Sequence, residues 1–164
     1  MKRANASLDD LRRVYENRLA ELRRVAAAIV GDRELAADVV QDAFVRAVRQ
    51  RGSFAGRGSL EAWVWRIVVN TARDARAGLQ RIDGSELVED VPAVERGDDW
   101  RRSVVRAAVE ALPERQRLVV FLRVYADLDY GTIASVMGIQ PGTVAATLNA
   151  AHERLRELLA DVRS

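Results

Sequence analysis

The apolar positions of the chain follow helical spacing through most of its length. In one stretch Leu60, Val64, Ile67 and Thr71 recur at intervals of three and four residues, which places them on one side of a helix. Strictly alternating apolar and polar runs, which are typical of strands, are missing, and Ala, Leu, Arg and Glu dominate. The pattern therefore predicts an all-α protein.

Two helices with clear end signals are predicted at the N-terminus. The first covers about residues 8–30, and Ser7 precedes it as the predicted N-cap. Gly31 and Asp32 follow, and we expect this pair to end the first helix and to cap a second over about residues 33–50.

A third helix completes the predicted N-terminal domain. It follows a loop at residues 51–58, begins after Ser59 as N-cap and reaches about residue 77. We expect the three helices to form one domain over residues 1–78.

The helical periodicity fails after the third helix. Residues 79–99 accumulate acidic residues and Gly and contain Pro92, a composition typical of a flexible linker. Residues 82–99 hold seven acidic side chains against Arg96 alone, whereas residues 1–81 are net basic. An acidic linker that follows a basic domain suits a nucleic-acid-binding protein, although a solvated surface gives the same pattern.

Four further helices are predicted in a second domain over residues 100–164. Pro113 marks the start of one of them, because proline is favoured in the first turn. The four helices cover about residues 100–111, 113–125, 129–137 and 141–161.

The last two of these helices carry a helix-turn-helix pattern, with the sequence YGTIASVMGIQPGTVAATL at residues 130–148. Ala134 allows close approach of the second helix, Gly138 can take the left-handed conformation that ends the first, and Val144 fills the space between them. A small core is completed by Ile133, Ile139 and Leu148. Any helical hairpin with a glycine turn shares some of this pattern, but DNA binding is the favoured interpretation.

The second helix of this pair is the predicted recognition helix. If Pro141 opens it, three backbone N–H groups face a phosphate, those of Gly142, Thr143 and Val144. The side chains that could face a major groove are Gln140, Thr143, Ala146, Thr147 and Asn149. The helix has no basic residue before Arg154, so we expect weak DNA binding by this domain alone.

Composition excludes several functional classes. The longest apolar runs are too short to span a bilayer, and residues 1–10 lack the features of a secretory signal, which favours a cytoplasmic location. The chain has no cysteine, so disulfides, thiolate metal sites and a cysteine nucleophile are excluded. His152 is the only histidine, and no phosphate-binding loop is present. We expect neither an enzyme nor a bound metal or cofactor.

Two blocks of the sequence resemble the extracytoplasmic function group of the sigma-70 family. The first, at residues 34–78, is ELAADVVQDAFVRAVRQRGSFAGRGSLEAWVWRIVVNTARDARAG, and the second, at residues 111–148, contains ALPERQRLVVFLRVYADLDYGTIASVMGIQPGTVAATL. The resemblance implies a sigma region 2-like domain, a linker and a sigma region 4-like domain. It also implies core RNA polymerase and promoter DNA as partners, an anti-sigma factor as regulator, and a monomer when free.

The resemblance further implies which residues meet the polymerase clamp. They lie on the predicted exposed face of the second helix, which also carries Glu34, and are Asp38, Gln41, Asp42 and Val45. The opposite face, predicted to be core, carries Ala36, Val40, Phe44 and Ala47.

Residues 53–59 resemble the family loop that captures a base flipped out of the minus-10 element. Phe54 either stacks on the base or anchors the loop in the core, and both roles remain open. Trp63 and Trp65 cannot share one helix face, and we expect Trp63 to lie on the apolar stripe with Ile67. The residues implied in minus-10 binding are Phe54, Arg57, Trp63, Arg66, Asn70 and Arg73, with Arg76 continuing their polar row.

The recognition helix departs from the family pattern, and rival functions follow from that. The family commonly has basic residues where this chain has Ala145, Thr147, Asn149 and Ala150. A sigma-like adaptor that binds polymerase or an anti-sigma factor without recognising DNA is therefore the main alternative. A stand-alone repressor would need a dimer interface and a basic recognition helix, and neither is evident. The acidic linker would either follow the polymerase RNA path as an RNA mimic or act as a plain tether.

Overall fold

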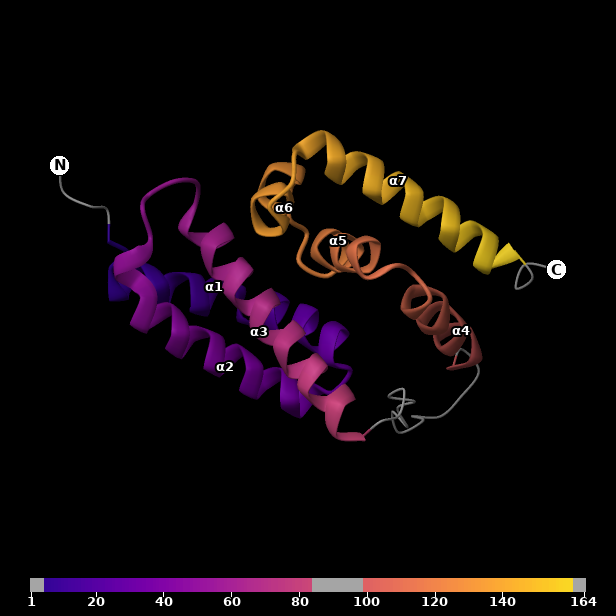
Figure 1. Ribbon diagram of the computed structural model, residues 1–164, viewed down its shortest axis with the longest axis horizontal. Coiled ribbons are helices and arrows are strands. Elements are labelled where there is room, and N and C mark those ends of the chain that lie inside the picture. The colour runs from indigo at the N-terminus through magenta and orange to yellow at the C-terminus, as the bar shows by residue number, and fades with distance from the viewer. Residues whose placement is uncertain (1–4, 84–98, 161–164) are drawn as a thin grey trace.

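The computed structural model of this chain describes residues 5–83 and 99–160, and within them it consists of helices and loops (Figure 1). The all-α prediction is confirmed. The helices are α1 (Leu8–Val30), α2 (Arg33–Gln50), the short 3-10 helix η1 (Arg51–Ser53), α3 (Leu60–Asp83), α4 (Asp99–Glu110), α5 (Glu114–Val124), α6 (Tyr130–Met137) and α7 (Pro141–Leu158).

The first three helices pack against one another as one unit, seen at the indigo and magenta end of Figure 1. Their end signals act as the sequence predicts. The Ser7 hydroxyl accepts a hydrogen bond from the backbone N–H of Asp10 at 3.0 Å, and Gly31 ends α1 with φ of 78°. Asp32 then accepts from the N–H of Leu35 at 2.9 Å and begins α2.

Helix α3 is longer than predicted. Ser59 caps it, accepting from the N–H of Ala62 at 3.0 Å, but the helix ends at Asp83 and not near residue 77. A single Gly78 weakens a helix by about 1 kcal/mol without ending it, and the residues that follow it are mostly good helix formers. The first residues assigned to the linker therefore belong to α3, and residues 84–98 lie outside the described part of the chain.

The core of the first unit holds one tryptophan, and the prediction named the wrong one. Trp65 is fully buried with Val64 and Val68, whereas Trp63 is only partly buried. The spacing of Leu60, Val64, Ile67 and Thr71 correctly marks the inner side, but that side is broad enough to include position 65. Trp63 lies at its edge.

Helices α5, α6 and α7 form the second unit and contain the predicted helix-turn-helix. Asp129 caps α6, accepting from the N–H of Thr132 at 2.7 Å, and Gly138 ends it with φ of 66°. Pro141 is the first residue of α7, and Pro113 lies one residue before α5. The predicted small core is confirmed: Ala134, Ile133, Val144 and Leu148 are buried, and Ile139 packs against them.

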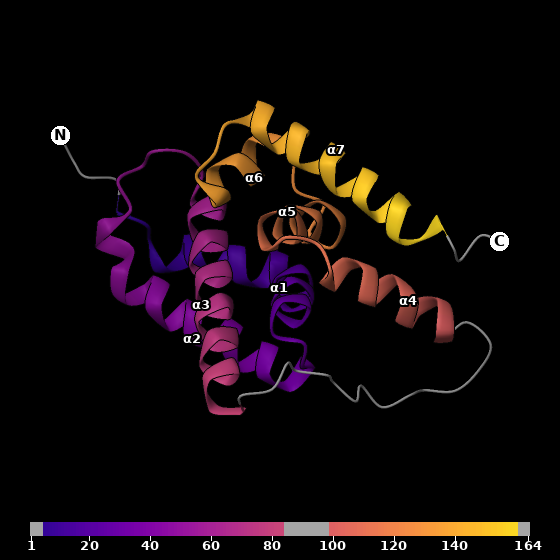
Figure 2. The same cartoon turned by 45° about the vertical axis from the view of Figure 1, so that its right-hand side comes forward.

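The two units lie against each other (Figure 2). Helix α3 contacts α6 and helix α1 contacts α5, while α4 touches α7. The buried apolar residues of both units form one connected cluster. The contacts bring the outer side of α3, where the sequence places its polar row, toward the second unit.

Candidate nucleic-acid interface

The polar row of α3 is the first part of the candidate site. Arg66, Asn70 and Arg73 are exposed, and Arg76 is partly exposed. Because these positions recur at three and four residues, the helix brings the four side chains to neighbouring positions along its length. The predicted row therefore exists as one surface.

Three arginines of this row bind groups in the second half of the chain. A guanidinium N–H of Arg66 donates to the carbonyl oxygen of Ser135 in α6. Nε of Arg73 lies 2.8 Å from Oε1 of Glu114 at the start of α5. Nη2 of Arg76 lies 3.3 Å from a Glu110 carboxylate oxygen.

Arg76 is the best anchored of the three. Its Nη1 also donates to the carbonyl oxygen of Ile29 in α1 at 3.0 Å, so this side chain joins α3 to α1 as well as to α4. Its side chain is 24% exposed, against 46% for Arg73. Arg73 is therefore the more available of the two for a new partner.

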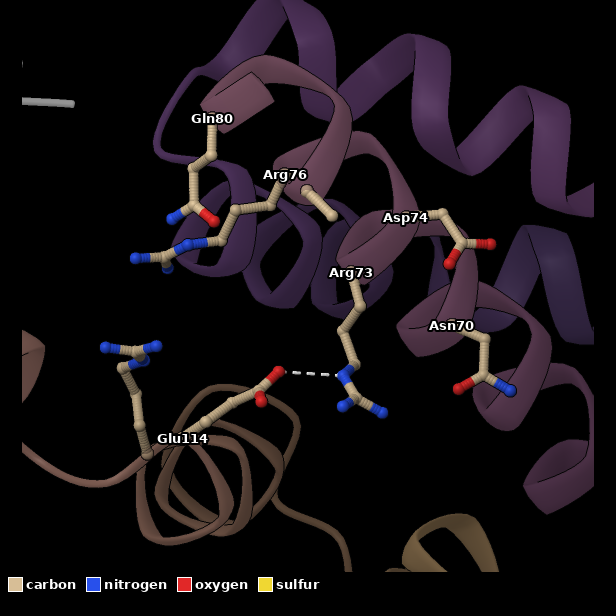
Figure 3. A pocket seen from close by; sticks show the side chains of 8 residues that line it. Asn70, Arg73, Asp74, Arg76, Gln80 and Glu114 are labelled. Atoms are coloured by element: carbon tan, nitrogen blue, oxygen red, sulfur yellow. Dashed lines mark hydrogen bonds and ion pairs between the residues drawn. The ribbon is translucent and has the colours of Figure 1, made fainter. Parts of the chain in front are cut away.

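A hollow of about 640 Å³ lies between α3 and the start of α5 (Figure 3). Arg73 points across it to Glu114, while Asn70 and Asp74 lie on the side of α3 away from that contact. Arg117 also lines it, and burial lowers the pKa of Arg117, with the nearby Arg76 charge adding to the effect. The hollow is lined by Asn70, Arg73, Asp74, Arg76, Ala77, Gln80, Glu114 and Arg117.

The loop before α3 holds its aromatic side chain inward. Phe54 is partly buried, and its ring centre lies 5.6 Å from that of Trp63. In this structure Phe54 thus serves as the anchor of the loop. Gly56 and Gly58 have φ of 70° and 73°, a region where glycine is favoured, and Arg57 between them is exposed.

The predicted polymerase-facing side of α2 is open to solvent. Its five side chains are all exposed, and Val45 is 46% exposed although it is apolar. Asp42 lies 3.2 Å from Arg46 of the same helix, and Arg46 also approaches Asp74 of α3 at 3.8 Å. The exposed side comprises Glu34, Asp38, Gln41, Asp42 and Val45; on the opposite side Ala36, Val40 and Ala47 are buried and Phe44 is partly buried.

The predicted groove-facing residues of helix α7 form an uncharged surface. Gln140, Ala146 and Asn149 are exposed, whereas Thr143 and Thr147 are half-buried, and the Thr147 hydroxyl donates to the carbonyl of Thr143 at 2.7 Å. Because Asn149, Ala146 and Gln140 carry no charge, this surface offers hydrogen bonds and shape but no salt-dependent attraction.

The predicted phosphate site at the start of α7 needs correction. The N–H groups of Thr143 and Val144 both donate to the carbonyl oxygen of Gln140, at 3.0 and 3.1 Å. The first turn therefore satisfies two of the three donors that we expected to face a phosphate.

Sequence inspection missed the partners of the α3 row. Glu110 ends α4 and Glu114 begins α5, so no single-helix spacing relates them, and the Ser135 contact uses a backbone carbonyl that any residue has. It also missed three exposed apolar residues near the α5–α6 turn, Val124, Tyr125 and Tyr130. Two of them, Tyr125 and Tyr130, are aromatic residues within six positions of each other near a predicted turn, and this clustering was the sequence signal that could have indicated an exposed apolar surface.

Within residues 5–83 and 99–160, no group of three or more His, Asp or Glu side chains could hold a metal ion. His152, the one histidine, is exposed on α7. None of the helices that the structure describes is long and apolar enough to cross a membrane.

Comparison with known proteins places both units in one family. Residues 14–82 match Sigma-70 region 2, and residues 102–155 match Sigma-70, region 4. The RNA polymerase sigma-H factor of Pseudomonas aeruginosa is 30% identical over 146 residues, covering 79% of this chain and 76% of that protein. The ECF RNA polymerase sigma-E factor of Escherichia coli K12 is 32% identical over 134 residues, covering 72% and 70%.

Solved structures share the fold over nearly the whole chain. The sigma factor RpoE, solved with the anti-sigma factor NepR from Bartonella quintana, has a TM-score of 0.71 and 26% identity and covers 93% of this chain and 98% of its own. CnrH, solved with the cytosolic domain of CnrY, has a TM-score of 0.72 and 21% identity, covers 97% and 92%, and shows likeness of fold. The two matched regions, in the order found here, and the identity to sigma-E and sigma-H show that this chain belongs to the extracytoplasmic function group of the sigma-70 family of RNA polymerase sigma factors.

Proposed function

We propose that this sigma factor divides promoter recognition between α3, which holds the opened minus-10 element, and α7, which contacts the upstream minus-35 duplex. The observation that carries the proposal is the row of Arg66, Asn70, Arg73 and Arg76 on one side of α3, next to the glycine-rich loop. Arginines bind backbone phosphates, and an asparagine amide can donate to and accept from a base edge. Core RNA polymerase performs the chemistry.

The open face of α2 is the proposed contact with the polymerase clamp. It combines the carboxylates of Asp38 and Asp42 with the amide of Gln41 and the apolar Val45, and all four side chains are exposed. Such a mixture of an apolar centre and charged surroundings is typical of protein interfaces that also select their partner by charge.

The loop at residues 51–58 is the proposed pocket for a flipped base. Gly56 and Gly58 let the backbone approach a base closely, and Arg57 between them is exposed. Phe54 and Trp63 already contact each other, so either ring meets a base only where its edge is free or after the pair separates. Taking a base out of the stack costs a few kcal/mol, which these contacts have to offset.

Helix α7 is proposed to recognise the upstream duplex mainly by shape. The candidate side chains are Gln140, Thr143, Ala146, Thr147 and Asn149, and no basic residue precedes Arg154. Such a helix gains little from counterion release, so its affinity depends on the rest of the complex holding it on the DNA.

An anti-sigma factor is the proposed regulator, acting where polymerase acts, in the cytoplasm. RpoE and CnrH, which share this fold, were solved with NepR and with the cytosolic domain of CnrY, respectively. The exposed apolar Val45, Val124 and Tyr125 offer surface to such a partner. We infer further that the chain is a monomer when free, and that residues 84–98, which lie outside the described part, connect the two domains.

The test of the proposed function is transcription in vitro with purified chain, bacterial core polymerase and a pool of genomic promoter fragments, followed by sequencing of the RNA starts. We expect discrete starts with shared upstream motifs. Asn70→Ala and Asp42→Arg should abolish them, whereas Asn17→Ala, which changes an exposed asparagine on α1, should not. Polymerase binding without initiation would refute the proposal and favour an adaptor that does not recognise DNA.

A further inference from the structure

The hollow between α3 and the start of α5 collects arginines from both helices (Figure 3). Arg73 and Arg76 come from α3, and Arg117 comes from α5. Gln80 follows Arg76 by four residues and points to the same side of α3, so its amide joins the arginines. Guanidinium groups that converge on one space are a common means by which proteins bind phosphate groups.

One carboxylate oxygen shows where two of these arginines meet. Nη2 of Arg76 and Nη1 of Arg117 lie 3.3 and 3.2 Å from the same Oε2 atom of Glu110. Two positive charges thus share one negative charge. The Arg117 side chain is only 12% exposed, so water screens its charge poorly.

The pKa of Arg117 reflects this excess of positive charge. Burial lowers the pKa, and the charge of Arg76 lowers it further, although Glu110 and Glu114 act in the opposite direction. The charged form of Arg117 is therefore less stable here than in water, and an added anion nearby would stabilise it.

The other carboxylates of the hollow are engaged elsewhere. Glu114 is paired with Arg73 at 2.8 Å. Asp74 lies on the side of α3 away from that contact and approaches Arg46 of α2 at 3.8 Å. Neither of them offsets the charge that Arg76 and Arg117 share.

The arginines also have hydrogen-bond donors to spare. A guanidinium has five N–H donors. Within residues 5–83 and 99–160, Arg73 uses only Nε, for Glu114, and Arg117 uses only Nη1, for two oxygens of Glu110. The volume of about 640 Å³ falls within the range of roughly 300–1,000 Å³ that is typical of small-ligand pockets. A ligand larger than one phosphate group therefore fits.

We propose that this hollow binds a small ligand with a chain of phosphate groups, held by Arg73, Arg76 and Arg117 with the Gln80 amide at its rim. Nucleotides and inorganic polyphosphate share this chemistry. Arg117 and Gln80 lie outside the row that we propose for promoter DNA, and the test needs neither DNA nor polymerase. The inference therefore stands apart from the proposed function.

The first test is isothermal titration calorimetry of the full chain with tripolyphosphate at low salt. Arg117→Met removes a charge from the hollow, and its matched control is Arg115→Met, which removes the same charge from an exposed position on another side of α5. We expect Arg115→Met to bind like the unaltered chain and Arg117→Met to bind at least about ten-fold more weakly. Equal affinities of the two variants would overturn the proposal.

A second pair of variants covers the case in which Arg117→Met fails to fold, which circular dichroism melting reveals. Gln80→Glu adds a negative charge at the exposed rim of the hollow, and Gln50→Glu makes the same change at an exposed position at the end of α2. We expect Gln80→Glu to weaken tripolyphosphate binding about five-fold relative to Gln50→Glu, because like charges repel. Equal binding by this pair would likewise contradict the assigned site.

The choice of ligand separates the possible sources. Inorganic phosphate should bind at least about ten-fold more weakly than tripolyphosphate, because it offers fewer oxygens to three guanidinium groups. ATP that binds more tightly than tripolyphosphate would assign the site to nucleotides, and equal or weaker ATP binding would assign it to inorganic polyphosphate. Inorganic phosphate binding as tightly as tripolyphosphate, or no saturable binding of tripolyphosphate and ATP at millimolar concentrations, would overturn the proposal.

Discussion

Helices α3 and α7 are the two proposed DNA-contacting helices, and they differ in charge and in what covers them. The outer side of α3 carries three arginines and each of them contacts another part of the chain. The corresponding side of α7 carries Gln140, Ala146 and Asn149, all exposed and uncharged. The row on α3 thus combines positive charge with contacts inside the chain, whereas the side of α7 is open but uncharged. Under the proposed function we expect neither helix alone to bind DNA strongly, so that promoter binding depends on polymerase.

The largest effect expected is on the buried side of α3. Trp65→Ala should lower the free energy of unfolding by about 3–5 kcal/mol, because Trp65 is fully buried and a cavity remains after truncation. Urea unfolding followed by circular dichroism measures it. Trp100→Ala, at a side chain that is 52% exposed on α4, is the control and should change stability by less than about 0.5 kcal/mol. A similar change in both variants would show that α3 is not anchored through Trp65.

The second prediction concerns α2, which we propose binds polymerase and not DNA. Asp42→Arg should weaken binding to core polymerase at least about ten-fold, or about 1.4 kcal/mol, because it reverses a charge in the proposed interface. Biolayer interferometry with immobilised core polymerase measures it. Glu16→Arg makes the same change on α1 and should bind normally. Unchanged binding by Asp42→Arg would move the clamp contact away from α2.

The third prediction concerns a substitution that gives α7 a positive charge, as α3 has. Ala150→Arg should raise affinity for promoter duplex about three- to ten-fold at low salt, since one added phosphate contact steepens the slope of log K against log salt by about 0.9. Ala150→Gln adds a side chain of similar reach without charge and serves as control. If the salt slope of Ala150→Arg equals that of Ala150→Gln, the exposed side of α7 does not lie on DNA.

The smallest effect tests the cap on which the helix-turn-helix begins. Asp129→Ala should lower the free energy of unfolding by about 1 kcal/mol, because the Asp129 carboxylate accepts from the N–H of Thr132. That hydrogen bond lowers the pKa of Asp129. The charged form is therefore favoured by folding, and its contribution is present above the unfolded-state pKa and disappears as pH falls through the folded-state value.

Asp129→Asn isolates the charge from the cap. Asparagine caps helices about as well as aspartate, so stability near pH 7 should change little while the loss at acid pH becomes smaller. Urea unfolding at pH 7 and pH 3 measures both quantities. An acid response of Asp129→Asn equal to that of the unaltered chain would assign the acid loss to other carboxylates.

Most of the fold could be predicted from the sequence because its signals are local. Ser7, Gly31, Asp32 and Pro141 act within one turn of their own positions, and α1 and α2 have the predicted ends. The end of α3 was missed because acidic residues and Gly78 suggested a linker, although neither stops a helix. Which of Trp63 and Trp65 is buried depends on how much of the circumference of α3 is covered. The packing of α1 and α2 against α3 decides that, and the sequence of α3 alone does not show it.

For the candidate site, the exposure of single residues could be predicted from the sequence, but the contacts between them could not. Exposure of Asp42 on α2 and of Asn70 on α3 followed from helical spacing. The contacts of Arg66 and Arg73 with α6 and α5 join residues 69 and 41 positions apart, and nothing local in the sequence encodes them. They depend on how two helical units dock, which is a property of their surfaces as a whole.

The unbroken course of α3 sets the spacing of its contacts with the second half of the chain. Arg66 and Arg76 are ten residues apart on one continuous helix, which separates their contacts with Ser135 and Glu110 by about 15 Å along the axis. Arg73 meets Glu114 between them. One helix therefore fixes where α6, the start of α5 and the end of α4 lie relative to one another, and a proline placed between Arg66 and Arg76 would shift these contacts together.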